Sequence, residues 1–226
     1  MKLNLKSFTQ TTINLGVFLI IVYASYLLIL ISLRYVYFEK NIDFLSTKQL
    51  IYHVRIWRFS FYTHVFTSPI VILAGILQFN RWLIRTKPKL HKTLGYVYII
   101  VVLFITGPAA FVMSLYANGG RIAQTSFVIL SVLWLSFTYL SYRKIRSGDA
   151  LNHAKWNIRS YALTLSAVTL RFYAYMFDVI NVNLGPKETY IIISYLGWIP
   201  NLLIAELLIY WKYPQNLLQH KKINSL

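Results

Sequence analysis

Apolar residues recur along the chain in runs of the length that a bilayer requires. The runs cover residues 12–36, 57–80, 93–116, 122–142, 155–178 and 189–211, and polar residues concentrate between them. A helix needs roughly 20 apolar residues to cross a hydrocarbon layer about 30 Å thick, and in lipid its backbone groups must hydrogen-bond within their own segment. The pattern predicts an all-α polytopic membrane protein, a bundle of about six transmembrane helices forming a single membrane domain over residues 1–226.

Composition supports this interpretation against a soluble or nucleic-acid-binding protein. Hydrophobic residues make up 57% of the chain and charged residues only 13%, about half the share that is usual in a globular protein. The net charge of +17 comes from short basic segments between apolar runs rather than from a basic domain, so we expect the lipid bilayer and no nucleic acid as partner. The chain has no cysteine, which excludes disulfides and thiolate metal sites.

The distribution of Lys and Arg predicts the orientation. The connections after the second, fourth and sixth runs are rich in basic residues, namely Arg81, Arg85, Lys87, Lys89, Lys92, Arg143, Lys144, Arg146, Lys155, Lys212, Lys221 and Lys222. The alternate connections are poorer or mixed in charge, with Arg121 alone in one and Lys187 beside Glu188 in another. Because positive segments stay inside, both termini are expected in the cytoplasm.

The fifth run carries a polar face along its whole length. Its members recur at intervals of three or four residues: His153, Asn157, Ser160, Thr164, Ala167, Arg171, Tyr175 and Asp178. Such spacing places them on one side of a helix, so this side must meet protein or enclosed water. Packing of a central helix would explain the small residues, but it explains Arg171 poorly.

Charged and imidazole side chains at membrane depth are candidate functional groups. His64 in the second run and Arg171 in the fifth both lie about 10 Å from the outer end at helical rise, so they are candidates for one shared site. The alternatives are that Asp178 neutralises Arg171 or that Arg171 reaches outward to the interface. Arg159 and Glu206 lie at similar depths near the inner end, and we expect a buried, structural ion pair between them.

His91 and His153 open the third and fifth runs at the same side of the membrane. Two neutral imidazoles from facing helices can hold one haem iron from opposite sides, and Gly95, one turn after His91, would leave room for a porphyrin. The alternative is that both histidines are solvated or hydrogen-bonded at the interface. His53 and His220 lie outside the runs and are expected to be exposed.

A set of spaced motifs over residues 61–173 resembles a bacterial family of predicted membrane proteins, domain of unknown function 2306. The matching features are Gln78-Phe79 before a basic loop, His91-Lys92-x-x-Gly95-x-x-Tyr98, Trp134, His153-x-x-Trp156-x-x-Arg159-Ser160-Tyr161 and Thr169-x-Arg171, with His64 ahead of them. Lys92 and Asn157 stand where the family often has Arg and Met. The resemblance implies a protein of the bacterial cytoplasmic (inner) membrane. A weaker likeness is to b-type cytochromes of the cytochrome b561 kind, although these pair histidines at both membrane faces.

The leading functional hypothesis is a haem-binding or quinone-linked membrane redox protein. His91 and His153 would ligate the iron of haem b, and Arg171 or Arg159 would contact propionates or a quinone oxygen. The alternatives are a small permease or lipid-interacting protein, with His64 and Arg171 as an anion site, and a non-catalytic membrane subunit. No zinc-protease, nucleophile-elbow or phosphate-loop motif occurs in the sequence, which argues against catalysis by the polypeptide alone. Whether the protein is an enzyme stays open.

Overall fold

The computed structural model describes residues 5–182 and 184–219, and about 80% of it is helical, without a strand in this part of the chain. The helices are α1 (Leu5–Leu33), α2 (Asp43–Ser46), α3 (Arg55–Leu77), α4 (Arg81–Thr86), α5 (Pro88–Val101), the π-helical η1 (Val102–Thr106), α6 (Gly107–Ser114), α7 (Gly120–Arg146), α8 (Ala150–Thr164), α9 (Ser166–Val179), α10 (Pro186–Leu196), α11 (Ile199–Tyr210) and α12 (Tyr213–Leu218). The predicted all-α fold is confirmed. His220, Lys221 and Lys222 lie outside the described residues.

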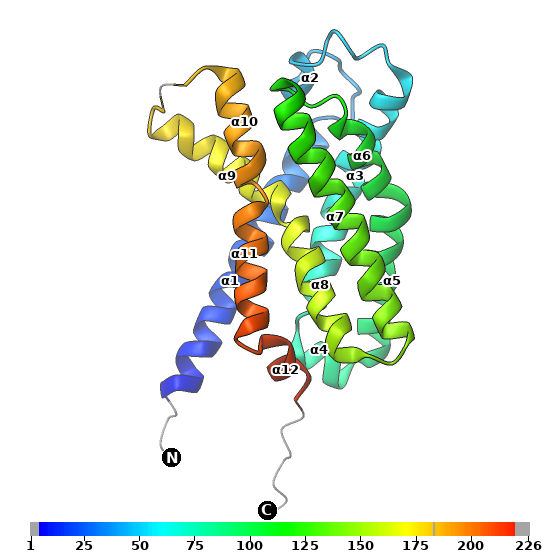
Figure 1. Cartoon of the computed structure of the whole chain (residues 1–226), viewed down its shortest axis with the longest axis vertical. Coiled ribbons are helices and arrows are strands. Elements are labelled where there is room, and N and C mark those ends of the chain that lie inside the picture. The colour runs from blue at the N-terminus through cyan, green and yellow to red at the C-terminus, as the bar shows by residue number, and fades with distance from the viewer. Residues whose placement is uncertain (1–4, 183, 220–226) are drawn as a thin grey trace, which may run out of the picture.

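Five helical stretches are long and apolar enough to cross a membrane. They are Leu15–Leu33, Arg55–Leu77, Pro88–Ser114, Gly120–Arg146 and Pro186–Tyr210, and they match five of the six predicted runs. The run at 155–178 is the exception, because it forms two shorter helices, α8 and α9, that meet at Leu165. The prediction of one continuous helix there is wrong. In Figure 1, α9 leaves the direction of α8 and runs outward towards α10.

The break between α8 and α9 has a visible cause in the neighbouring chain. Asn201 of α11 donates a hydrogen bond from Nδ2 to the carbonyl oxygen of Ala162 at 3.2 Å and another to Thr169 Oγ1 at 3.0 Å. A polar side chain that inserts into the backbone ladder is a recognised cause of helix kinks. The α10–α11 join at Gly197 lies at the same level, since Thr169 Oγ1 donates to the Gly197 carbonyl. Two helix breaks therefore lie side by side and satisfy each other's polar groups.

The three prolines of the predicted spans interrupt helical hydrogen bonding in different ways. Pro108 and Pro200 stand in the first turns of α6 and α11, where a missing N–H is tolerated. Pro69 lies inside α3 and leaves the carbonyl of Val65 without its helical donor. Ser32 Oγ of α1 donates to that oxygen at 3.1 Å, so a neighbouring helix satisfies the group that lipid could not.

Helix α8 packs against α7, α11, α3 and α12, and its polar face is partly structural. Ser160 and Thr164 accept or donate hydrogen bonds with Tyr98 Oη at 2.7 and 2.8 Å, and Trp134 Nε1 donates to Thr164 Oγ1 at 2.9 Å. These groups are buried. The expectation that small and polar residues of this helix pack against its neighbours is confirmed for this central part.

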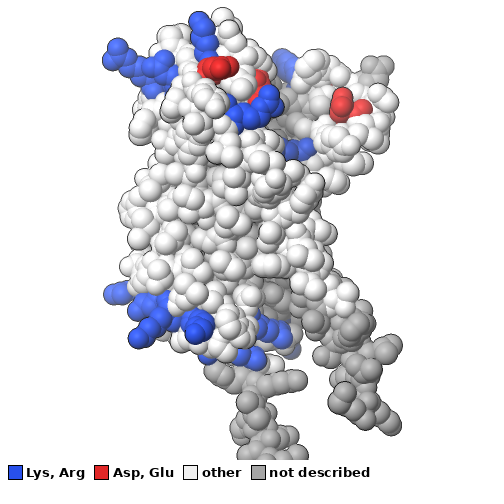
Figure 2. Space-filling view, turned by 180° about the vertical axis from the view of Figure 1, so that it is seen from behind, with Lys and Arg blue, Asp and Glu red and all other residues white. Residues whose placement is uncertain are grey.

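On the face that Figure 2 shows, charged side chains gather at the two ends of the molecule and leave an uncharged belt between them. We call the end that holds α4, α12 and the α7–α8 turn the lower end, and the end that holds α2 the upper end, as Figure 1 draws them. In the view of Figure 2 the lower end shows Lys and Arg alone, whereas the upper end also carries acids. Such a belt between charged ends is what a membrane-spanning bundle requires. The cytoplasmic placement of the lower end stays a prediction.

Candidate functional site

A cavity of about 420 Å³ opens at the lower end, and both His91 and His153 line it. We call it the lower pocket. His91 lies in the first turn of α5 and His153 in the first turn of α8, two helices that begin at this end. The structure therefore brings together the two histidines that the sequence placed at one side of the membrane. Further residues of α5 and α8, the ends of α3 and α7, and α4 and α12 supply the rest of the lining.

Hydrogen bonds fix the ring of His153. Its Nδ1 lies 2.9 Å from the carbonyl oxygen of Ser141 and 3.0 Å from Ser141 Oγ, and that hydroxyl also contacts the His153 carbonyl oxygen at 3.2 Å. Because a carbonyl only accepts, the network assigns the proton of a neutral ring to Nδ1. Nε2 then keeps its lone pair, and metal-binding histidines are commonly held by this type of backbone contact.

His91 has an unmet hydrogen-bonding group. Its Nδ1 is buried and has no hydrogen-bond partner within the described residues. Buried polar atoms in native proteins are nearly always paired, so an atom of this kind points to a missing ligand or water. His91 and His153 also lie close enough to interact electrostatically.

The space beside Gly95 differs from what the sequence predicts. A Cβ on Gly95 would lie 3.1 Å from Oε1 of Gln78, so the glycine lets the end of α3 approach α5 rather than leaving an open slot. Two basic residues line the pocket as well, Lys92 and Arg146; the sequence indicated them as topology signals, and Lys92 as part of a family motif, but not as site residues.

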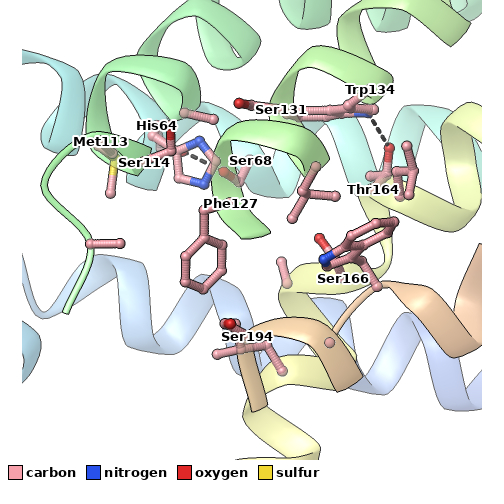
Figure 3. Close-up of a pocket in the computed structure, with 18 of the residues that line it drawn as sticks. His64, Ser68, Met113, Ser114, Phe127, Ser131, Trp134, Thr164, Ser166 and Ser194 are labelled. Atoms are coloured by element: carbon pink, nitrogen blue, oxygen red, sulfur yellow. Dashed lines mark hydrogen bonds between the residues drawn. The ribbon is translucent and has the colours of Figure 1, made fainter. Parts of the chain in front are cut away.

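A second cavity, of about 190 Å³, lies in the upper half of the bundle, and His64 and Arg171 both line it. We call it the upper pocket. Figure 3 shows side chains of α3, α6, α7 and α10 converging on it, with the ring of Phe127 between the His64 ring and Ser194. The structure thus brings His64 and Arg171, which the sequence places at one depth, to the lining of one cavity. Nδ1 of His64 lies 3.4 Å from the carbonyl oxygen of Thr106, which is long for a hydrogen bond.

Arg171 has no carboxylate partner in the described part of the chain. None of the ion pairs found there includes it, and its one hydrogen bond runs from Nη1 to the Ala167 carbonyl oxygen at 2.7 Å. Asp178 therefore does not neutralise it. Many protein atoms surround Arg171, yet the residue is exposed, as expected of a side chain that lines an open pocket.

Lys48 is a third basic residue in the lining of the upper pocket. Only 4% of it is exposed, and its Nζ donates to the carbonyl oxygen of Tyr116 at 2.5 Å and lies 5.3 Å from the centroid of the Phe44 ring. Burial lowers the pKa of its ammonium group to about 8. Sequence reasoning missed Lys48, because it belongs to a connection of mixed charge that gives no sign of folding back into the bundle.

Arg159 forms the predicted pair with Glu206 but does not reach either pocket. Its Nε and Nη2 donate to the two carboxylate oxygens at 2.6 and 2.8 Å, and its guanidinium lies 4.6 Å from the ring centroid of Trp156. The predicted burial is wrong, since the Glu206 side chain is 47% exposed. The pair links α8 to α11 and is partly exposed, with the Glu206 carboxylate more accessible than the Arg159 guanidinium.

The comparisons with known proteins bear on residues of both pockets. The family model for predicted membrane proteins (DUF2306) matches residues 61–209. The chain belongs to the DUF2306 family. The comparisons with curated proteins and with solved structures gave no match.

The DUF2306 match covers every candidate site residue that the sequence supplied, from His64 to Arg171. It extends beyond the residues that carry the resemblance and takes in α10, which contributes to the lining of the upper pocket, and nearly all of α11. Together with the five apolar helices, it makes the chain an integral membrane protein. Lys48 lies outside the matched range. His53 is exposed, as predicted, and the weaker likeness to b-type cytochromes stays a prediction.

Proposed function

We propose that the protein is a membrane redox protein that binds a b-type haem in the lower pocket, where His91 and His153 would hold the iron. The observation that carries the proposal is that two imidazoles from different helices line one cavity and that one of their nitrogens is buried without a partner. Haem iron held between two histidines passes single electrons.

The residues of the pocket fit such a group. Its volume of about 420 Å³ falls within the range of roughly 300–1,000 Å³ that is usual for cofactor sites. His153 is already oriented by Ser141 and has Nε2 free to ligate. Apolar and aromatic side chains, among them Phe79 and Ile99, supply walls suited to a porphyrin.

The basic partners of the propionates differ from those that the sequence predicts. Arg171 lines the other pocket and Arg159 is bound to Glu206, so neither is available to a group held by His91 and His153. Lys92 and Arg146 line the lower pocket near its charged end, and we assign the propionates to them. A quinone is a second possible occupant of this pocket, hydrogen-bonded through its oxygens to the same histidines.

The test is a reduced-minus-oxidised absorbance spectrum of the protein expressed with haem supplied and purified in detergent. We expect a b-type band in the wild-type protein that is lost in His91→Ala and in His153→Ala. His53→Ala is the matched control, because His53 is exposed, and it should keep the band. A wild-type protein without the band, or a band unchanged in both pocket variants, would overturn the proposal, and extraction of a quinone would then identify the other occupant.

A further inference from the structure

The upper pocket is positively charged and lacks compensating acids. Arg171 and Lys48 both line it, and its lining, among the residues that the structure describes, contains no Asp or Glu. An unpaired cation within a membrane bundle is costly, and two in one cavity are more so. Each keeps donors to spare after its backbone contact, since an ammonium has three and a guanidinium five.

The remaining walls are apolar and rich in aromatic rings. Trp57, Trp134, Trp198, Phe44 and Phe127 line the cavity, and Figure 3 shows the ring of Phe127 directed into it from α7. Several hydroxyl groups of the lining are already engaged with their own helices; for example Ser68 and Ser114 donate to the carbonyls of His64 and Phe111. The pocket therefore combines two cationic side chains, Arg171 and Lys48, with walls that are mostly apolar.

Three departures from regular helix surround this cavity. Ser166 and Gly197 in its lining stand at the α8–α9 and α10–α11 joins, and the η1 segment ends at Thr106, against His64. Irregular backbone at membrane depth is tolerated where it is buried in protein or lines a cavity, and π-helical segments are frequent at functional sites. The backbone thus departs from regular helix near His64 and Arg171, the two residues of this pocket that the sequence indicates as a shared site.

The volume limits the ligand. An engineered cavity of roughly 150 Å³ holds one benzene molecule, so the upper pocket, at about 190 Å³, has room for a single ring and one small charged group. Inorganic phosphate would leave the aromatic walls unused, and a lipid chain would exceed the space.

We propose that the upper pocket binds a small apolar monocarboxylate, its ring-sized body among the tryptophans and phenylalanines and its carboxylate held by Arg171 and Lys48. The site is separate from the lower pocket and does not depend on whether haem is bound there.

The test is equilibrium dialysis of radiolabelled benzoate against the full chain in nanodiscs of uncharged lipid, with empty nanodiscs subtracted. We expect saturable binding, and a loss of affinity of about tenfold or more in Arg171→Gln and in Lys48→Met, because each removes one charge-assisted contact to the carboxylate. Arg121→Gln and Lys40→Met are the matched controls, since both residues are exposed, and they should leave the affinity unchanged.

Competing ligands separate this site from other kinds of pocket. Benzamide has the ring without the charge and acetate the charge without the ring, so both should compete with benzoate at least about tenfold more weakly. Equal competition by benzamide, or tighter binding of phosphate than of benzoate, would overturn the proposal, as would unchanged affinity in both pocket variants. The ligand comparison uses the wild-type protein and therefore decides the matter even if a variant does not fold.

Discussion

The charges of three basic side chains, Arg159, Arg171 and Lys48, are balanced in different ways, and the differences separate a structural role from a binding role. Arg159 is paired with Glu206 and stacked on Trp156, so its charge is balanced within the protein. Arg171 and Lys48 contact only backbone oxygens, and Lys48 an aromatic face. Because the protein supplies no counter-charge to these two in the described residues, an anion from outside is the economical partner.

Lys48 should make anion binding sensitive to pH. Burial lowers the pKa of Lys48 to about 8, so its charge in the free protein falls from about nine-tenths at pH 7 to about one-tenth at pH 9. Benzoate favours the charged form, and its affinity should therefore decrease as the pH rises above 8. Dialysis at several pH values between 7 and 9 measures this decrease.

The Lys48→Arg variant is the control for that titration, because arginine stays protonated over the whole range. It should bind benzoate with little change between pH 7 and 9. The other titratable side chains of the pocket are His64, Arg171 and Tyr190, and a decrease that persists in Lys48→Arg would assign the titration to them instead.

At the scale of single residues, the sequence was informative where a helix fixes the depth. Counting 1.5 Å per residue was enough to place His64 and Arg171 at one depth, and Arg159 and Glu206 at another. The positions of the helix starts were enough to place His91 and His153 at the same end. It failed for Lys48, whose position depends on how residues 34–54 fold over the upper end. It also failed to predict that the Arg159–Glu206 pair is partly exposed, since the depth of a residue does not indicate which side of its helix packs against the bundle.

At the scale of helices, the sequence predicted where apolar segments lie but not where they break. No proline or glycine marks Leu165, where α8 ends. The break depends on Asn201, 36 positions further along the chain, whose amide competes for the Ala162 carbonyl. A long-range contact of this kind leaves no trace in local periodicity.

The paired helix breaks also bear on the alternative hypothesis of a small permease. Discontinuous helices line the binding sites of many transporters, and the sequence alone did not indicate such helices.

Close contact between α3 and α8 gives a test of the bundle at this scale. A Cβ on Gly75 would overlap the ring of Tyr161 and come within 3.0 Å of Tyr98. Tyr161 cannot easily move, because its hydroxyl donates to the Ile72 carbonyl oxygen at 3.1 Å. Gly75→Ala should therefore destabilise the protein by about 1–3 kcal/mol, the usual cost of overpacking.

The midpoint of thermal unfolding in detergent, followed by tryptophan fluorescence, measures that loss, and we expect it several degrees lower in the variant. Gly16→Ala is the matched control, since a Cβ there would meet nothing within 4 Å. An unchanged midpoint in Gly75→Ala would show that α3 and α8 are packed less closely than the structure indicates.

At the scale of the whole molecule, the two pockets lie on either side of one hydrogen-bonded network. Tyr98 lines the lower pocket, while Thr164 and Trp134 line the upper one, and the three are joined through Thr164 Oγ1. The buried network forms the wall between the cavities, so the protein holds a histidine site and a cationic site at opposite ends without a continuous opening through these residues.

Orientation and the number of crossings can be tested together, because the native chain has no cysteine and any introduced thiol reports on its own position. Lys40 and Lys187 are exposed near the upper end, and Lys89 and Ser147 are exposed at the lower end (Figure 1). The basic lower end predicts a cytoplasmic location. In intact cells, a membrane-impermeant maleimide should therefore label Lys40→Cys and Lys187→Cys, whereas Lys89→Cys and Ser147→Cys should react only after the membrane is opened.

The reverse labelling pattern would mean that the orientation is inverted. Labelling of both Lys187→Cys and Ser147→Cys in intact cells would mean that α8 and α9 do not jointly cross the membrane. The pair of broken helices would then be a re-entrant element packed within a bundle of five spans.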